Sequence, residues 1–235
     1  MAIFLQQASP KLTVDAGVSG GVSFSATPAA GSTVLVMLGS YNNTSRSALS
    51  VTDNQGNTYV LDKEKATGFA GSVTWASIWR ASNVASSGTF TVTITLDNAT
   101  GYLSAACLEV RGVKKTSPLD QTSSANDGGT AGTTAAPGSV TTTTTHQYVV
   151  PVLAWNVSNA GFTAPAGYIT RVTEFDGITH QGMNGRDKIL TAAGSENPTW
   201  TLNVADYWAV VIATYKAEPA LMPVKSSIHP ALLTR

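Results

Sequence analysis

Apolar and polar residues follow patterns along this chain that are typical of β-strands. From residue 89 to 96 threonines alternate with large apolar residues, which predicts a strand with one buried face. The apolar run at 34–38 and the mostly apolar segment 102–110 predict buried strands, and further strands are expected at 57–61 and 73–79. Helical periodicity is scarce, so the sequence predicts an all-β protein.

The pattern repeats in the second part of the chain. Val149–Leu153 resembles Val34–Leu38, and Tyr207–Ala213 resembles Tyr102–Leu108, with the order of the segments preserved. We therefore expect pseudo-repeats at about 30–115 and 140–216. Stacking the apolar faces of two sheets predicts a two-sheet β-sandwich of jelly-roll type that spans residues 1–216. All the tryptophans lie in predicted strands, where large rings fill the space between sheets.

Small polar residues dominate the segment between the two pseudo-repeats. Residues 121–140 are almost wholly Thr, Ser, Gly and Ala, and Asp127-Gly128-Gly129 and Pro137-Gly138 interrupt regular structure. We interpret 121–140 as a connecting loop, with Ser123 to Gly138 long and exposed.

The last residues, 217–235, form a separate C-terminal arm. Pro219, Pro223 and Pro230 exclude a regular helix or a central strand. The arm is nevertheless too apolar for a solvated tail, so we expect it to be extended and to lie on a partner or on its own body. Its expected partner-binding residues are apolar: Leu221, Met222, Val224, Ile228, Leu232 and Leu233.

Composition excludes several classes of function. Lys plus Arg equals Asp plus Glu, and only 12% of residues are charged, which argues against nucleic acid and anionic lipid as partners. No apolar stretch is long enough to span a membrane, and residues 1–7 do not resemble a signal peptide, so we expect synthesis in a host cytoplasm. Cys107 is the single cysteine and lies in an apolar run, so we expect it to be buried.

The sequence gives only weak support for any catalytic or metal-binding site. Asp53–Asn57 and Asp97–Gly101 group oxygen ligands that could hold Ca²⁺, although a hairpin turn explains them better. The carboxylates Glu109, Glu174 and Asp176 could serve a glycosidase, although exposed strand positions explain them better. The histidines follow no zinc-ligand spacing; they are His146, His180 and His229. We expect no cofactor, no metal and no enzymatic activity.

Aromatic residues near the predicted loops leave two interpretations open. Such rings can stack on sugars, or they can cover the open end of the core, which we favour. The residues concerned are Tyr41, Phe69, Phe162, Tyr168 and Phe175.

A series of turn and strand-end motifs carries a family resemblance. It begins with Val-Thr-Asp-x-x-Gly-Asn-Thr-Tyr at 51–59 and continues through 77–81, 88–94, 108–113 and 117–120. This succession resembles a loosely defined set of β-sandwich structural proteins of tailed bacteriophages, prophages and bacterial surfaces. The resemblance spans about residues 30 to 215 and is carried by structural positions, so it implies a fold and a setting but transfers no site residue.

The resemblance implies a non-enzymatic virion protein on the particle surface, such as a capsid decoration or fibre-type subunit anchored partly through its C-terminal arm. The implied partners are major capsid or tail subunits and further copies of the chain, with a trimer as one form. The alternative is a carbohydrate-binding or host-adhesion module of a tail or cell surface, with a glycan as its ligand.

Overall fold

The structure is a computed structural model that describes residues 2–15, 17–42, 49–69, 72–96, 102–156, 161–175 and 182–219. It is all-β, with 63% strand and no helix among the described residues. The prediction of an all-β sandwich is therefore confirmed. Within the described ranges no helix could cross a membrane.

The first half of the molecule contains a large and a small antiparallel sheet. The large sheet has the order β1-β9-β4-β7-β6, with β2 also pairing with β9, and the small sheet has the order β3-β8-β5. The bounds are β1 Phe4–Ala8, β2 Leu12–Val14, β3 Ser19–Ser23, β4 Thr33–Asn42, β5 Leu49–Asp53, β6 Val60–Phe69, β7 Ser72–Ala81, β8 Thr91–Leu96 and β9 Tyr102–Arg111.

The second half has the same arrangement. Its large sheet has the order β10-β19-β13-β16-β15, its small sheet has the order β11-β18-β14, and β12 pairs with β17. The bounds are β10 Leu119–Asn126, β11 Gly132–Ala135, β12 Val140–Thr141, β13 Gln147–Trp155, β14 Phe162–Thr163, β15 Ile169–Glu174, β16 Gly182–Leu190, β17 Ser195–Glu196, β18 Trp200–Asp206 and β19 Trp208–Lys216. The central strands β4 and β13 contain the repeated segments Val34–Leu38 and Val149–Leu153.

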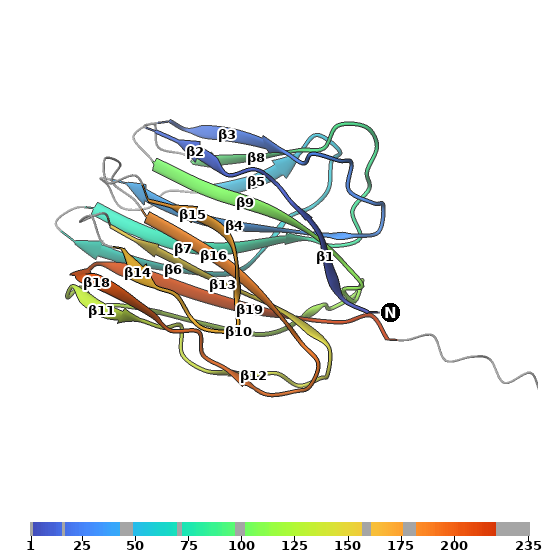
Figure 1. Ribbon diagram of the computed structural model, residues 1–235. Helices are drawn as coiled ribbons and strands as arrows, with labels where there is room; N and C mark the ends of the chain where they lie inside the picture. The colour runs from blue at the N-terminus through green and yellow to red at the C-terminus, as the bar shows by residue number, and fades with distance from the viewer. Residues whose placement is uncertain are drawn as a thin grey trace, which may run out of the picture.

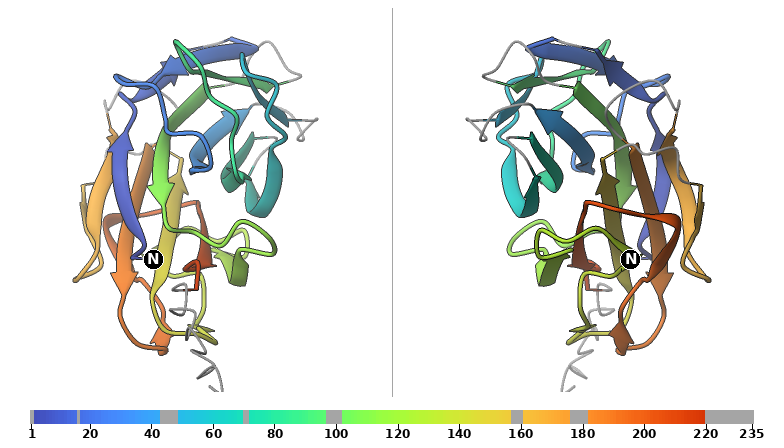
Figure 2. Two further views of the ribbon diagram at one scale, coloured as in Figure 1. Left: turned by 90° about the vertical axis from the view of Figure 1, so that its right-hand side faces the viewer. Right: turned by 90° about the vertical axis from the view of Figure 1, so that its left-hand side faces the viewer.

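The sheets stack in four layers, small, large, large and small, as Figures 1 and 2 show. One apolar cluster fills the space between the two large sheets. A second cluster lies between the large and small sheets of the first half, and a third lies between those of the second half. This differs from the expected pair of sheets. The reason is that β4 and β13 are apolar on both faces: Leu35 and Met37 face the other half, whereas Val34 and Val36 face the small sheet. Strands buried on both faces need a cover on each side.

The segment predicted as a loop at 121–140 contains the greater part of β10, the whole of β11 and the start of β12. β10 pairs with β19, so that Ser123 lies opposite Ile212, and β11 pairs with β18. β10 is the edge strand of its sheet and all its residues are half-buried. An edge strand tolerates polar side chains, and threonine favours extended backbone. β10 is therefore a strand although its sequence lacks the alternation of apolar and polar residues.

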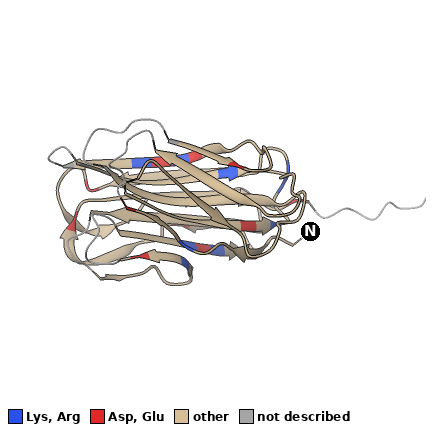
Figure 3. Ribbon diagram, turned by 90° about the horizontal axis from the view of Figure 1, so that it is seen from above, with Lys and Arg blue, Asp and Glu red and all other residues tan. Residues whose placement is uncertain are grey.

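Charged positions are few and mixed in sign. In the view from above, blue and red positions follow one another along the same strands (Figure 3). Cys107 is fully buried on β9, as the sequence predicts. Burial raises the pKa of its thiol to about 12, against a smaller opposing effect of Ser9.

Candidate functional site

The C-terminal arm begins as part of the body. Ala217 N donates to the carbonyl oxygen of His146 (3.1 Å), and Glu218 N donates to that of Gly112 (2.7 Å). Lys115 N donates in turn to Glu218 Oε2 (3.0 Å). Both halves of the chain thus hold residues 217 and 218 in place.

The predicted partner-binding residues of the arm lie outside the described residues, which end at 219. They are Leu221, Met222, Val224, Ile228, Leu232 and Leu233. The described part of the arm is its root, residues 217–219.

A cavity of about 540 Å³ adjoins this root. Its apolar lining comes from the start of β1, from the segment before β4 and from the segment after β9, and charged side chains complete it. The lining includes Phe4, Ala30, Val113, Arg111, Lys115 and Glu218. Phe4 is 40% exposed, which is unusual for a phenylalanine on a strand. Sequence reasoning missed this cavity, because it forms where segments far apart in the chain meet.

A buried carboxylate lies near the same end of the first half. Glu109 on β9 is fully buried and accepts hydrogen bonds from Ser32 Oγ (2.8 Å), Ala29 N (2.9 Å) and Gln7 Nε2 (2.7 Å). Arg111 Nε adds a bond of 3.2 Å. Burial alone would raise the pKa of Glu109, but these donors together outweigh it and hold the pKa below its ordinary value.

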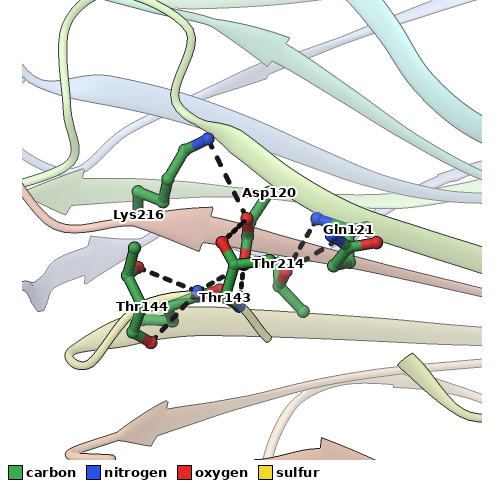
Figure 4. Close-up of polar contacts among 7 residues, drawn as sticks. Asp120, Gln121, Thr143, Thr144, Thr214 and Lys216 are labelled. Atoms are coloured by element: carbon green, nitrogen blue, oxygen red, sulfur yellow. Dashed lines mark hydrogen bonds and ion pairs between the residues drawn. The ribbon is translucent and has the colours of Figure 1, made fainter. Parts of the chain in front are cut away.

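The second half has a comparable cluster around Asp120 on β10, shown in Figure 4. Asp120 accepts hydrogen bonds from Thr143 N (2.7 Å), Thr143 Oγ1 and Gln147 Nε2, and Lys216 Nζ lies 3.9 Å away. Burial again opposes ionisation, and these donors together lower the pKa of Asp120. Glu109 thus ties the segment before β4 to Gln7 of the edge strand β1, and Asp120 of the edge strand β10 binds Thr143, before β13, and Gln147, at its start.

Comparison of the chain with protein-family models, with curated proteins and with solved structures found no match. The candidate site is therefore judged on its own geometry and chemistry.

The turn considered for calcium is occupied by its own hydrogen bonds. Asp53 Oδ1 accepts from the backbone N of Gln55 (2.9 Å) and of Asn57 (3.1 Å), and Oδ2 accepts from Asn57 Nδ2 and Tyr59 OH. This segment joins β5 of the small sheet to β6 of the large sheet, so it is a crossover between layers rather than the hairpin expected from sequence. The second segment considered for calcium, Asp97–Gly101, lies wholly outside the described ranges.

The remaining candidate residues do not gather into one site. Glu174, like Glu109, is buried and does not lie on the exposed strand face expected from sequence; it pairs with Lys11 and accepts a hydrogen bond from Thr13. His146 contributes its backbone oxygen to the arm root. Asp176, His180 and His229 lie outside the described residues. Within the ranges that the structure describes, no three His, Cys, Asp or Glu side chains are arranged to hold a metal ion.

The loop aromatics pack mainly on the core. Tyr41 and Tyr168 are buried, and the ring of Phe162 lies 5.4 Å from that of Trp155. Phe175 also lies near Trp155, at 6.4 Å, but remains 38% exposed. The side chain of Phe69 is not among those described. This packing favours the interpretation that the rings cover the core.

Proposed function

We propose that this chain is a non-enzymatic structural protein on the surface of a bacteriophage particle, a capsid decoration or fibre-type subunit that attaches to its neighbours partly through the C-terminal arm. The main support for the proposal is the structure of the arm root: hydrogen bonds hold residues 217 and 218 beside a mainly apolar cavity.

The arm has the composition of a segment that binds a surface. Beyond Pro219 it continues with closely spaced apolar residues, beginning with Leu221 and Met222. An extended chain spans about 3.3 Å per residue, so a segment as long as 220–235 is long enough to bridge to a neighbouring subunit. Burial of its large apolar side chains at roughly 25 cal/mol per Å² contributes several kcal/mol to attachment.

The buried carboxylates Glu109 and Asp120 support a structural role rather than a catalytic one. A general acid at neutral pH needs a raised pKa. The pKa values of Glu109 and Asp120 are lowered instead, by donors that connect strands and loops. Their hydrogen bonds stabilise the fold at the end of the molecule from which the arm leaves.

Removal of residues 220–235 tests the proposal. The truncated chain keeps Ala217–Pro219, because these residues belong to the body. We expect it to fold with the stability of the full chain but to be absent from particles purified from the phage that encodes it. A matched control carries Lys225→Ala and Thr234→Ala in a full-length arm and should be incorporated normally. Normal incorporation of the truncated chain would exclude the arm as the anchor.

The second candidate function is carbohydrate binding, as an adhesion module of a tail or cell surface. A polar pocket in the second half favours it, and that pocket is independent of the arm.

A further inference from the structure

A small polar pocket lies in the second half. The pocket has a volume of about 260 Å³ and lies between the β14–β15 connection and the segment from β17 to β18. Pro165 and Tyr168 line it from the first side, and Glu196, Asn197 and Thr199 from the other, with Lys188 of β16 between them.

In the first half the corresponding space is closed by amide side chains. Asn54 and Gln55 of the β5–β6 connection both donate to the carbonyl oxygen of Thr89. Asn57 exchanges two hydrogen bonds with the backbone of Ala85, of 2.7 and 2.9 Å. Gln55 Oε1 also accepts from Ser87 N and Ser87 Oγ. These bonds join the β5–β6 connection directly to the β7–β8 connection, so their side chains occupy the space between the two connections.

Sequence explains why the second half is open. The connection after β5 reads Asn54-Gln55-Gly56-Asn57-Thr58-Tyr59, whereas the one after β14 reads Ala164-Pro165-Ala166-Gly167-Tyr168. Gly56 and Gly167 share a positive φ (77° and 78°), and each connection ends in a tyrosine, which aligns the two. Pro165 and Ala166 thus replace Asn54 and Gln55, and the second connection is shorter. The side chains that close the first half have no equivalent.

The polar groups of the pocket are held in place before any ligand arrives. Lys188 Nζ donates to both oxygens of Glu196 (2.8 and 3.0 Å) and lies 5.2 Å from the centre of the Tyr168 ring. Tyr168 OH donates to Glu196 Oε2 (2.6 Å). Burial, and then Glu196, raises the pKa of Tyr168, so the phenol keeps its proton at neutral pH. Each side chain is oriented by the others, which reduces the entropy that binding must overcome.

The chemistry of the lining suits a neutral, hydroxyl-rich ligand. Lys188 retains an N–H beyond those given to Glu196, the carboxylate retains lone pairs, and Asn197 offers an amide with both donors and an acceptor. The lysine and the carboxylate cancel in charge, so the pocket has little preference for a phosphate or sulfate. Its volume is below the ~300–1,000 Å³ of pockets for drug-sized molecules, which fits one small unit of a longer ligand.

We propose that this pocket binds a single residue of a neutral saccharide. The proposal does not rest on the arm or on particle attachment, and a chain truncated after Pro219 tests it equally well.

Saturation-transfer NMR on the full chain, with defined neutral mono- and disaccharides at millimolar concentration, measures this binding directly. The test variant Ala166→Gln restores the closing side chain that Gln55 supplies in the first half. The matched control Gln55→Ala removes a closing side chain from the first half and leaves the pocket intact. A second variant, Asn197→Ala, removes one exposed polar group of the lining.

We expect saccharide signals with the unmodified chain and with Gln55→Ala, loss of signal with Ala166→Gln, and about tenfold weaker binding with Asn197→Ala, the effect of one lost hydrogen bond. Absence of transfer to every neutral saccharide overturns the proposal. Binding that survives both Ala166→Gln and Asn197→Ala, or binding of charged sugars alone, also overturns it.

Discussion

Tyr215 of β19 donates a hydrogen bond of 2.8 Å to Asp62 Oδ2 of β6 and so joins the two halves across the central core. Tyr215 is fully buried, and burial followed by the charge of Asp62 raises the pKa of its phenol, which therefore stays a donor. Arg80 holds the same carboxylate through two bonds of 2.9 and 3.0 Å. This side-chain bond thus connects the two large sheets, in addition to the apolar contacts between them and the hydrogen bond from Asn126 Nδ2 of β10 to the carbonyl oxygen of Ala66 of β6 (2.7 Å).

Substitution Tyr215→Phe tests the strength of this connection. The change removes the hydroxyl and leaves Asp62 with Arg80 alone, so we expect a loss of about 1.5–3 kcal/mol in the free energy of unfolding. Urea denaturation measures it, and the m-value should stay unchanged because the fold is retained. A loss below about 0.5 kcal/mol would mean that this hydrogen bond contributes little to holding the halves together.

The second half contains the same ion pair with its charges exchanged. Arg80 lies opposite Val60 on a strand with an irregularity at Asp62, and Asp187 lies opposite Ile169 on a strand with an irregularity at Arg171. Arg171 Nε lies 2.9 Å from Asp187 Oδ2. The position therefore accepts either order of charge, provided that the pair is complete.

Charge exchange in the first half tests this tolerance. Asp62→Arg alone places two cations together in a buried site, so we expect a loss of about 3–5 kcal/mol. The double variant Asp62→Arg with Arg80→Asp should recover at least half of that loss. A double variant as unstable as the sum of the two single variants would contradict the equivalence of the two sites.

Acid should destabilise the protein through Glu109 and Asp120. The folded state lowers both pKa values below the ordinary 4.5 and 3.8. The stabilisation is therefore complete at neutral pH and is lost as the pH falls below these values. In Glu109→Gln we expect lower stability at pH 7, by about 1.5–3 kcal/mol, and a weaker dependence on pH below the ordinary value of 4.5.

Thermal unfolding across this pH range measures the effect, with the exposed Asp15→Asn as control. Parallel curves for Glu109→Gln and the unmodified chain would contradict the assignment.

Gly182 is required by the packing of Trp155. The two residues lie opposite each other in β16 and β13, and a Cβ at Gly182 would lie 1.9 Å from Trp155 Cε2. Because Trp155 is fully buried, its ring has little room to move. We expect Gly182→Ala to cost about 1–3 kcal/mol. The control is Gly194→Ala, where no heavy atom lies within 4 Å of the added Cβ, and the cost should stay below about 0.5 kcal/mol.

The sequence predicts the apolar central strands clearly, but it predicts the polar strands poorly. The runs at Val34–Leu38 and Val149–Leu153 identify β4 and β13, because both faces of these strands are apolar. The same runs imply cover on both sides, and that inference leads to four layers rather than two. β10 was missed since an edge strand needs no apolar face.

The polar sites were beyond sequence reasoning for a different reason. The Asp62–Arg80 pair depends on an irregular register between β6 and β7, which no local pattern encodes. The pocket at Tyr168 could have been found by aligning the two crossover connections and noting that Pro165 and Ala166 replace the amides of the first half. The cavity at Phe4 leaves no such signal.

The most direct test of the central claim is an electron cryo-microscopy reconstruction of the assembled particle, in which the chains that contact residues 220–235 are identified. The account predicts that Leu221 and Met222 are buried against another chain, either a shell or tail subunit or a second copy. Residues 220–235 lying wholly on their own body, in a chain that is incorporated into the particle, would contradict it.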